Sequence, residues 1–337
     1  MNMKNWAEGV IASPRRLAIP IMTHPGIEMI GKKVIDAVTD GEIHAKAIIA
    51  LNEKYPAAGS TVIMDLTVEA EAFGAQIHFS DNEVPSVIGR LLSNYDQVAA
   101  LQIPDLSAGR VPQYLKANKI VAKTITDKPT FGGVIGPFSL AGRLFDMTEI
   151  MMAIYTEPQT IELLLSKCAK FIKSYIEAIK QTGVSGVVIA EPAAGLLSNE
   201  DASAYSSKYI REIVETLQDD NFMIVLHNCG NTGHCTDSMV ETGAKGLHFG
   251  NKIDMNTALE QVPSDILVMG NLDPVAIFKQ ASAEQVAVAT CELLNRTKAY
   301  KNFIISSGCD TPPGVSEANI KAFYSACNAL KIEHATV

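Results

Sequence analysis

Two adjacent stretches decide the fold: PQTIELLLSKCAKFIKSYIEAIKQT at residues 158–182 and GVVIA at residues 186–190. The first repeats apolar side chains at intervals of three and four residues, which places them on one face of a helix. The second is short and wholly apolar, as is typical of a strand buried on both faces of a parallel sheet. A helix that leads directly into such a strand is the repeating unit of an α/β fold.

The same alternation continues along the 337-residue chain. Short apolar runs, closed by Gly, Pro, Asp or another polar residue, predict seven further strands at residues 17–22, 61–64, 131–135, 223–226, 246–248, 266–269 and 303–306. Eight strands with helices between them predict an α/β fold of the (β/α)₈ TIM-barrel type. A doubly wound sheet is the alternative.

Helical patterns also occur outside this regular alternation. Residues 28–56 predict two extra N-terminal helices, and residues 94–118 predict a helical insertion. Near the end of the chain, residues 282–295 and 316–330 predict helices with Ser282 and Ser316 as N-caps. Because no linker-like stretch interrupts the pattern, we expect one elaborated domain over residues 1–337.

The composition narrows the class of protein. Hydrophobic residues make up 47% of the chain and charged residues 19%, as expected for a globular protein with a large core. The net charge of −9, without a run of Lys or Arg, argues against a nucleic-acid partner. The N-terminus lacks a secretory signal, and no apolar stretch approaches a membrane span of about 20 residues, so we expect a cytoplasmic protein.

The stretch IVLHNCGNTGHC, residues 224–235, carries the strongest chemical signal. His227 and Cys229 follow a strand and are two positions apart, so in an extended backbone their side chains point the same way. Cys309, in IISSGCDTPPG, follows the end of another predicted strand. In a barrel both segments open on the C-terminal face. His227, Cys229 and Cys309 are therefore predicted to bind Zn²⁺ with one coordination position open, as in catalytic zinc sites.

The other cysteines and histidines have plainer interpretations. In a chain of this size six cysteines are expected as free thiols, ligands or core residues, not as disulfides. Cys235 is either a fourth ligand or part of the following helix, and His234 and His248 are either site groups or ordinary polar residues. Three cysteines lie on helical patterns and are predicted core residues: Cys168, Cys291 and Cys327.

Further polar residues follow other predicted strands: Asp65, Glu191, Asn271 and Asp273. Each alone is equally consistent with a turn residue or a helix cap. Several carboxylates and a metal motif at successive strand ends together indicate an active site.

These residues give the chain a resemblance to the uroporphyrinogen decarboxylase superfamily. The resemblance is carried by DLTVEAEAFGA from Asp65, GPFSLAGRL at residues 136–144 and GNLDP at residues 270–274. Within that superfamily, His227, Cys229 and Cys309 match the zinc pattern of the methylcobalamin:coenzyme M methyltransferase branch. The decarboxylases carry an arginine-rich segment after the first strand, whereas residues 22–28 read MTHPGIE here. A porphyrinogen substrate is therefore not expected, because binding its carboxylates needs arginine.

The resemblance implies methyl transfer from methylcobalamin, held as a corrinoid by a partner protein, to a zinc-activated small thiol such as coenzyme M. Asp65, Glu191 and His248 are then expected around the bound thiol, as orienting groups. Arg143 is a candidate for holding the sulfonate of coenzyme M, and Asn271 and Asp273 are expected to help bind the cofactor.

Other functions remain open at this point. A lyase similar to uroporphyrinogen decarboxylase and metal-assisted hydrolysis both fit the scaffold, although hydrolytic zinc sites favour His and carboxylate ligands. The methyl donor could be a methylated folate, and the acceptor could be homocysteine. A non-catalytic barrel that binds metal predicts a closed zinc site without an accessible position.

Overall fold

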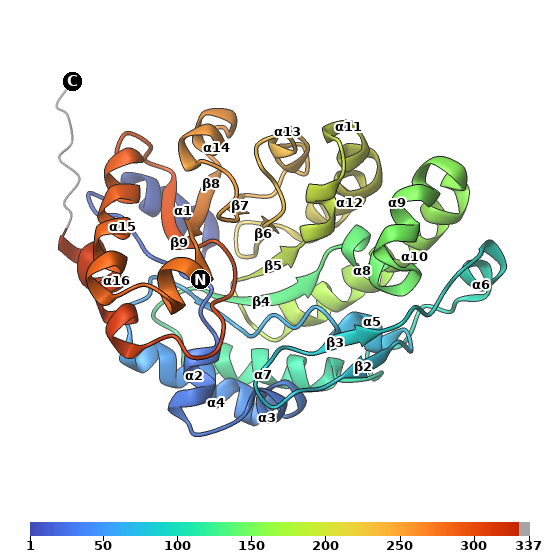
Figure 1. Cartoon of the computed structure of the whole chain (residues 1–337), viewed down its shortest axis with the longest axis horizontal. Coiled ribbons are helices and arrows are strands. Elements are labelled where there is room, and N and C mark those ends of the chain that lie inside the picture. The colour runs from blue at the N-terminus through green and yellow to red at the C-terminus, as the bar shows by residue number, and fades with distance from the viewer. Residues whose placement is uncertain (330–337) are drawn as a thin grey trace.

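The computed structural model describes residues 1–329, and a curled parallel sheet runs through its centre (Figure 1). The strands are hydrogen-bonded in the order β1, β4, β5, β6, β7, β8, β9. Their bounds are β1 Ser60–Thr61, β4 Thr130–Ile135, β5 Gly186–Ala190, β6 Met223–Asn228, β7 Gly246–Phe249, β8 Leu267–Leu272 and β9 Phe303–Ser307. Every neighbouring pair in this sheet is parallel.

The segment predicted as the first strand, residues 17–22, closes the sheet into a barrel. On one side Ile19 N donates to Ile305 O of β9 at 3.0 Å, and on the other Ala58 N donates to Ala18 O at 2.9 Å, just before β1. Only Ala18 makes a ladder bridge, to Ile305. Pro20 has no N–H to donate, which explains why the ladder stops there. The TIM-type barrel is confirmed, and its first strand is reduced to a single bridge.

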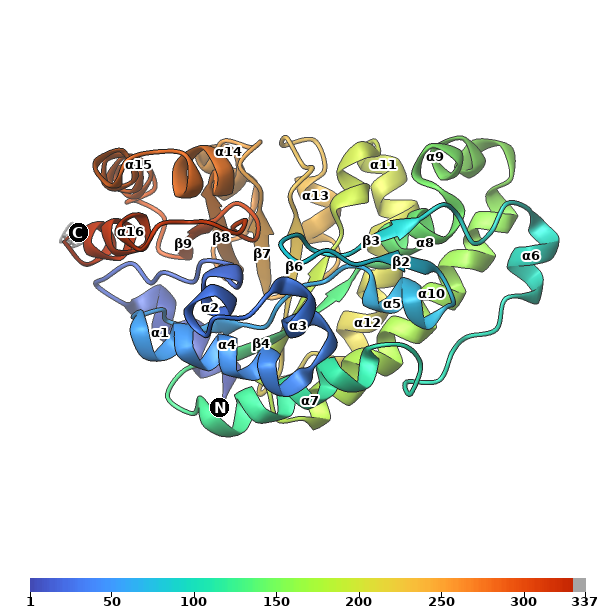
Figure 2. The same ribbon diagram turned by 60° about the horizontal axis from the view of Figure 1, so that its bottom comes forward.

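The helices follow the strands around the outside of the barrel (Figures 1 and 2). Within the described residues they are α1 Met3–Ala12, α2 His24–Met29, α3 Val34–Thr39, α4 Gly41–Lys54, α5 Val68–Ala72, α6 Tyr95–Ala100, α7 Val111–Thr124, α8 Pro137–Phe145, α9 Met147–Thr156, α10 Pro158–Gln181, α11 Asn199–Ala202, α12 Lys208–Leu217, α13 Thr236–Val240, α14 Met255–Gln261, α15 Ala283–Arg296 and α16 Glu317–Ala329. No helix among residues 1–329 is long and apolar enough to cross a membrane.

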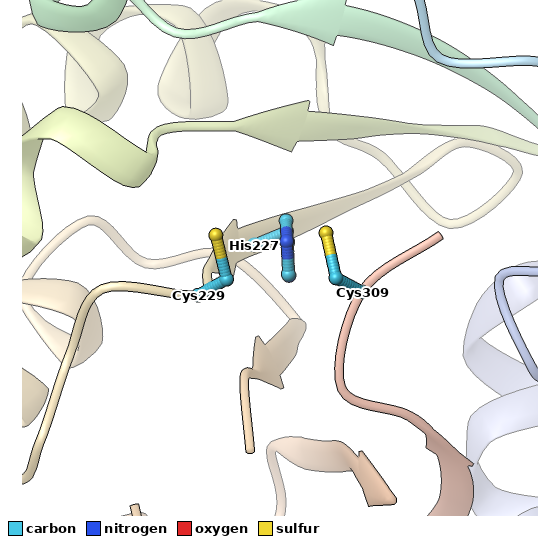
Figure 3. A group of neighbouring side chains, drawn as sticks. All are labelled: His227, Cys229 and Cys309. Carbon is cyan, nitrogen blue, oxygen red and sulfur yellow. The ribbon is translucent and has the colours of Figure 1, made fainter. Parts of the chain in front are cut away.

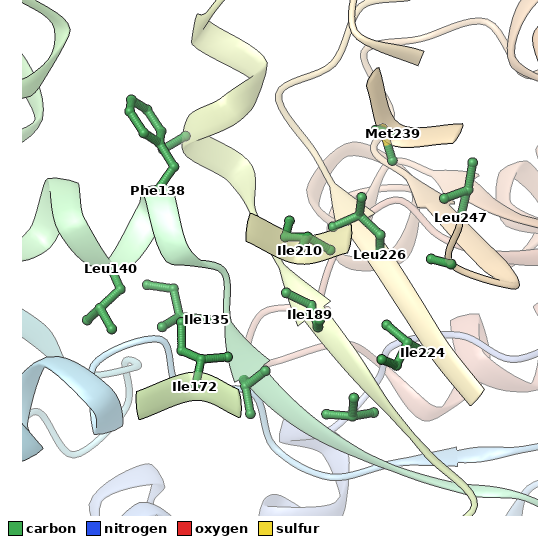
Figure 4. Packing of buried hydrophobic residues seen from close by; sticks show 14 of the residues in the cluster. Ile135, Phe138, Leu140, Ile172, Ile189, Ile210, Ile224, Leu226, Met239 and Leu247 are labelled. Atoms are coloured by element: carbon green, nitrogen blue, oxygen red, sulfur yellow. The ribbon is translucent and has the colours of Figure 1, made fainter. Parts of the chain in front are cut away.

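Both faces of the strands are buried, which explains why their sequences are apolar at every position. Alternate residues, such as Val188 and Val225, form a cluster inside the barrel. Their neighbours Ile189, Ile224 and Leu226 belong to the larger cluster that covers the outer face, against helices that include α10 and α12 (Figure 4). The alternation assigns each residue of a strand to the inside or the outside of the barrel.

Helix α1 closes the N-terminal end of the barrel. Its first turn is held by hydrogen bonds from Met3 N and Lys4 N to Asp220 O, just before β6. The ring of Trp6 meets that of Phe131 edge-on, with 6.4 Å between ring centroids. Because this end is filled, the barrel interior can open only at the C-terminal ends of the strands.

The predictions for the helices outside the regular alternation were partly correct. Residues 28–56 contain the two predicted helices, α3 and α4, and only the end of α2, through Met29, falls within this range. Asp40 separates the two, because it has an extended backbone that ends α3 and its side chain accepts from Glu42 N and Ile43 N at the start of α4. The predicted insertion at residues 94–118 divides into α6 and α7, and a short antiparallel hairpin of β2 (Gln76–His78) and β3 (Ser86–Ile88) was not predicted. Figure 2 shows α2, α3, α4 and α7 gathered on one side of the molecule.

The predicted N-caps near the C-terminus are confirmed. Ser282 forms a capping box with Gln285 at the start of α15. Ser316 Oγ accepts from Asn319 N at 3.1 Å at the start of α16. The predicted end of this helix, Leu330, lies outside the described residues.

Candidate active site

The side chains of His227 and Cys229, at the end of β6, point into the barrel. The strand extends through Asn228, so His227 is part of it, two residues beyond the inward-facing Val225. Cys229 follows two residues later, and Cys309 comes from the loop after β9. The ligand atoms of His227, Cys229 and Cys309 all lie within 4.8 Å of one another. Figure 3 shows the two cysteine sulfurs on either side of the His227 ring.

The surroundings of these thiols favour the anionic form that binds metals. A hydrogen bond from Cys309 and, to a smaller extent, the neighbouring His227 lower the pKa of Cys229 to about 4, against the opposing effect of burial. The same hydrogen bond and burial raise the pKa of Cys309. One thiolate is therefore stabilised by the geometry of the pair, and thiolate with imidazole is the donor set that suits Zn²⁺.

The ring of His227 leaves one nitrogen for a metal. His227 Nδ1 lies 2.8 Å from His248 Nδ1, and His248 Nε2 lies 2.9 Å from Ser306 Oγ. His227 Nε2 is buried and has no hydrogen-bond partner among residues 1–329. Burial and the neighbouring His227 keep the pKa of His248 well below its ordinary value, so that ring is neutral. A metal ion between the sulfurs of Cys229 and Cys309 would give His227 Nε2 a bonding partner, so these residues fit zinc.

The loop that carries Cys309 is held to the first segment of the barrel. Asp310 accepts from Thr23 N at 3.1 Å and from Thr23 Oγ1 at 2.6 Å. Thr311 N donates to Ile21 O at 3.1 Å. On the other side, Gly250 packs against Cys229, where a Cβ would lie 2.5 Å from Cys229 Cα. The anchoring role of Asp310 and Thr23 was not predicted, because they are 287 residues apart in sequence.

Glu191 lies on the outer side of β5. Its carboxylate accepts from Phe138 N at 2.9 Å and from Ser139 N at 2.6 Å, at the first turn of α8. Burial raises the pKa of this carboxyl to about 7, against the effect of those hydrogen bonds. The side chain is therefore engaged by α8, although its backbone N donates to His227 O at 2.8 Å.

Asp65 lies at the centre of a buried polar network. Its carboxylate forms an ion pair with Arg110 and accepts from Thr67 N, Thr67 Oγ1 and Tyr114 Oη. Arg110 also donates to Glu71 Oε2 at 2.6 Å. Arg110, Tyr114 and Glu71 were not singled out from the sequence, since nothing local indicates that α7 folds back onto residue 65.

Arg143 and Glu69 lie next to this network. Arg143, on α8, is half-buried and has no hydrogen-bond or ion-pair partner in the described part of the chain. Burial lowers its pKa, and the nearby Asp65 and Glu69 oppose that effect. Glu69 Oε1 accepts from Ile135 N at 3.0 Å, whereas Oε2 is buried without a partner among residues 1–329. Burial raises the pKa of Glu69 to about 8, so this carboxyl is mostly protonated at neutral pH.

The raised pKa of Glu69 predicts a pH-dependent stability. Between its ordinary pKa of 4.5 and about 8, the folded chain holds a proton that the unfolded chain has lost. The free energy of unfolding should therefore fall as pH rises through this range, by on the order of 4 kcal/mol from this group. In urea titrations from pH 4.5 to pH 8.5, Glu69→Gln should remove most of that fall. The exposed Glu53→Gln is the control and should keep it; equal pH profiles for Glu69→Gln and the parent protein would contradict the assignment.

Asn271 and Asp273 hold the loops that follow β7 and β8. Asn271 Nδ2 donates to Gly250 O at 2.9 Å and to Ile253 O at 2.7 Å. Asp273 Oδ1 accepts from Val275 N and Ala276 N, and its Oδ2 accepts from Asn251 Nδ2 at 2.7 Å. Both side chains thus fix the shape of the barrel mouth.

The remaining cysteines lie apart from the three ligands. Cys235 is buried at the N-cap of α13, where its thiol donates to Leu197 O at 3.4 Å. His234 Nε2 lies 3.0 Å from the same carbonyl. Cys168 and Cys327 are buried, as predicted, and Cys291 is half-buried.

The sequence as a whole identifies the family. The uroporphyrinogen decarboxylase family model matches residues 10–330. The chain belongs to this family. It is 32% identical over 286 residues to the methylcobamide:CoM methyltransferase MtbA of Methanosarcina acetivorans, covering 81% of this chain and 83% of that protein. It is 24% identical to the uroporphyrinogen decarboxylase of Alcanivorax borkumensis, over 87% of this chain and 84% of that one.

The solved structures agree with the family's fold. A methyltransferase from Methanosarcina mazei superposes with a TM-score of 0.86 over 97% of this chain and 98% of that chain, at 22% sequence identity. Two relatives above 30% identity, both from Methanosarcina, are named methylcobamide:CoM methyltransferases. The protein is accordingly a methyltransferase of the uroporphyrinogen decarboxylase family.

Proposed function

We propose that this enzyme moves a methyl group from a methylated corrinoid, carried by a partner protein, to a zinc-activated small thiol such as coenzyme M. One observation carries the proposal: two cysteines converge at the open end of the barrel with His227 Nε2, which has no hydrogen-bond partner among residues 1–329. The name of the Methanosarcina acetivorans relative, methylcobamide:CoM methyltransferase, supports the same donor and acceptor.

The three side chains have defined tasks in this proposal. His227 Nε2 and the sulfurs of Cys229 and Cys309 would hold Zn²⁺, and three protein ligands leave a position for the substrate. A zinc ion bound there would lower the pKa of the incoming thiol, which would lose its proton to solvent and bind as the thiolate. The two cysteine thiolates offset the charge of the ion, which keeps the substrate sulfur nucleophilic. The substrate thiolate would form the carbon–sulfur bond as the carbon–cobalt bond of the methylated corrinoid, the second substrate, breaks, and the electron pair of that bond would remain on the corrinoid.

The other polar residues would hold the substrate and the mouth of the barrel. In this proposal Asp65 and Glu191 orient the substrate indirectly, through the Arg110 network and through the position of α8. Asn271 and Asp273 would shape the loops over which the corrinoid approaches. Arg143 is the group proposed to bind the acidic end of the thiol, since it is a half-buried cation that lacks a partner in residues 1–329.

The role of Arg143 predicts a difference between charged and neutral thiols. A hydrogen bond to a charged group contributes about 1.5–3 kcal/mol, so Arg143→Gln should raise the KM for coenzyme M about tenfold or more. The KM for uncharged 2-mercaptoethanol should stay within about twofold. Arg90→Gln, which removes only an exposed 3.9 Å pair with Glu149, is the matched control. An equal rise for both thiols would contradict a role in recognising the acid group.

The reaction itself can be tested with the zinc-loaded protein and free methylcobalamin. Coenzyme M, homocysteine and tetrahydrofolate are offered separately, and the methylated product is identified by mass spectrometry. Loss of methylcobalamin absorbance with formation of a methyl thioether is the expected result. In parallel, uroporphyrinogen is offered as a decarboxylation substrate. Decarboxylation without any thiol methylation would overturn the proposal in favour of the lyase.

A further inference from the structure

Three buried side chains form a chain of contacts inside the barrel. His227 of β6 and His248 of β7 are paired across neighbouring strands, and Ser306 lies on β9. Their exposed fractions are 2%, 1% and 0%. Two short contacts connect them, 2.8 Å between the Nδ1 atoms of the two histidines and 2.9 Å between His248 Nε2 and Ser306 Oγ.

The contact between two Nδ1 atoms permits two proton arrangements. In the first, His227 Nδ1–H donates to His248 Nδ1, and His248 Nε2–H donates to Ser306 Oγ. In the second, every bond is reversed, and His227 carries its proton on Nε2. Only the first leaves a lone pair on His227 Nε2, the buried nitrogen that has no partner among the described residues. The proton position on His227 is thus coupled to that on His248 and to the serine hydroxyl.

We propose that His248 is a positioning residue, which with Ser306 holds His227 in the tautomer that presents Nε2 to the metal. The two histidines are neighbours on adjacent strands, so the same contact also fixes the orientation of the His227 ring. Partners of this kind orient metal ligands, and their loss typically weakens metal binding 10–100-fold. The inference rests on the proposed zinc centre.

Metal affinity, measured by competition with a chromogenic chelator, tests the inference without an activity assay. His248→Leu removes the acceptor for His227 Nδ1–H and should weaken Zn²⁺ binding about 10–100-fold. His248→Asn offers Oδ1 near the original Nδ1, so its affinity should stay within about threefold of the parent protein. Ser306→Ala should fall between the two. Ser307→Ala is the matched control, because this adjacent and equally buried hydroxyl bonds to Ile21 O instead.

The visible spectrum of the Co²⁺-substituted protein gives a second readout. The ligand-field bands of His248→Leu should differ from those of the parent protein, whereas those of His248→Asn should match them. Zinc binding by His248→Leu within twofold of the parent, or equal losses in the Leu and Asn variants, would overturn the inference alone. Absence of zinc binding by the parent protein would instead overturn the proposed centre.

Discussion

Replacing Cys309 by alanine is expected to abolish stoichiometric zinc binding and to reduce methyl transfer on the order of 10³-fold. The side chain supplies one of three ligand atoms that lie within 4.8 Å of one another. Without it, only His227 and Cys229 remain as protein ligands. A metal acting as a Lewis acid contributes several kcal/mol to such a reaction, which sets the size of the loss. Zinc content by atomic absorption and the rate of coenzyme M methylation measure the two effects.

The matched control for this variant is Cys291→Ala. Cys291 is also half-buried, but it lies on α15, outside the cluster of ligands. It should retain one zinc per chain and nearly the full rate. Full zinc occupancy in Cys309→Ala would contradict the assignment of this residue as a ligand.

Arg110→Met is expected to lower the free energy of unfolding by about 3–5 kcal/mol. The substitution leaves Asp65 as a buried carboxylate without its cation, and the side chain of Asp65 is 0% exposed in the ion pair. Breaking a buried pair from one side costs this much because the remaining charge is uncompensated. Urea unfolding at pH 7, followed by circular dichroism, measures the change.

Two further variants separate this explanation from a general effect of losing an arginine. Arg211→Met breaks an exposed 3.4 Å pair with Glu241 and should cost less than about 1 kcal/mol. Adding Asp65→Asn to Arg110→Met should restore part of the lost stability, because the unpaired charge is gone. A loss in Arg110→Met no larger than that in Arg211→Met would refute the buried-charge explanation.

The barrel could be predicted from sequence because its strands are buried on both faces. GVVIA in β5 and the runs before His227 and Cys309 have no polar alternation, and that pattern indicates a parallel sheet between layers. Two strands were exceptions. The second, predicted at residues 61–64, is only Ser60–Thr61 in the structure, and the first is shorter still. The hydrogen bonding of the first strand stops after a single bridge because of Pro20, an effect that apolar composition does not reveal.

The same apolar composition limited the prediction of the site. His227 and Cys229 could be placed on one face, since a spacing of two in a strand fixes their common direction. The direction of Glu191 could not be read from GVVIAE, where the five residues before it are all apolar or glycine. The structure turns that carboxylate outward to α8. Arg110 and Glu71 belong to a network that joins α5, the start of α7 and the segment after β1, and such tertiary contacts leave no local signal.

Zinc X-ray absorption of the purified protein, with and without coenzyme M, tests the central claim most directly. The account predicts one zinc per chain with two sulfur ligands and a mixed nitrogen or oxygen remainder, gaining a third sulfur when the thiol is added. A zinc shell that does not change with coenzyme M, homocysteine or 2-mercaptoethanol, or a protein that binds no stoichiometric zinc, would contradict it.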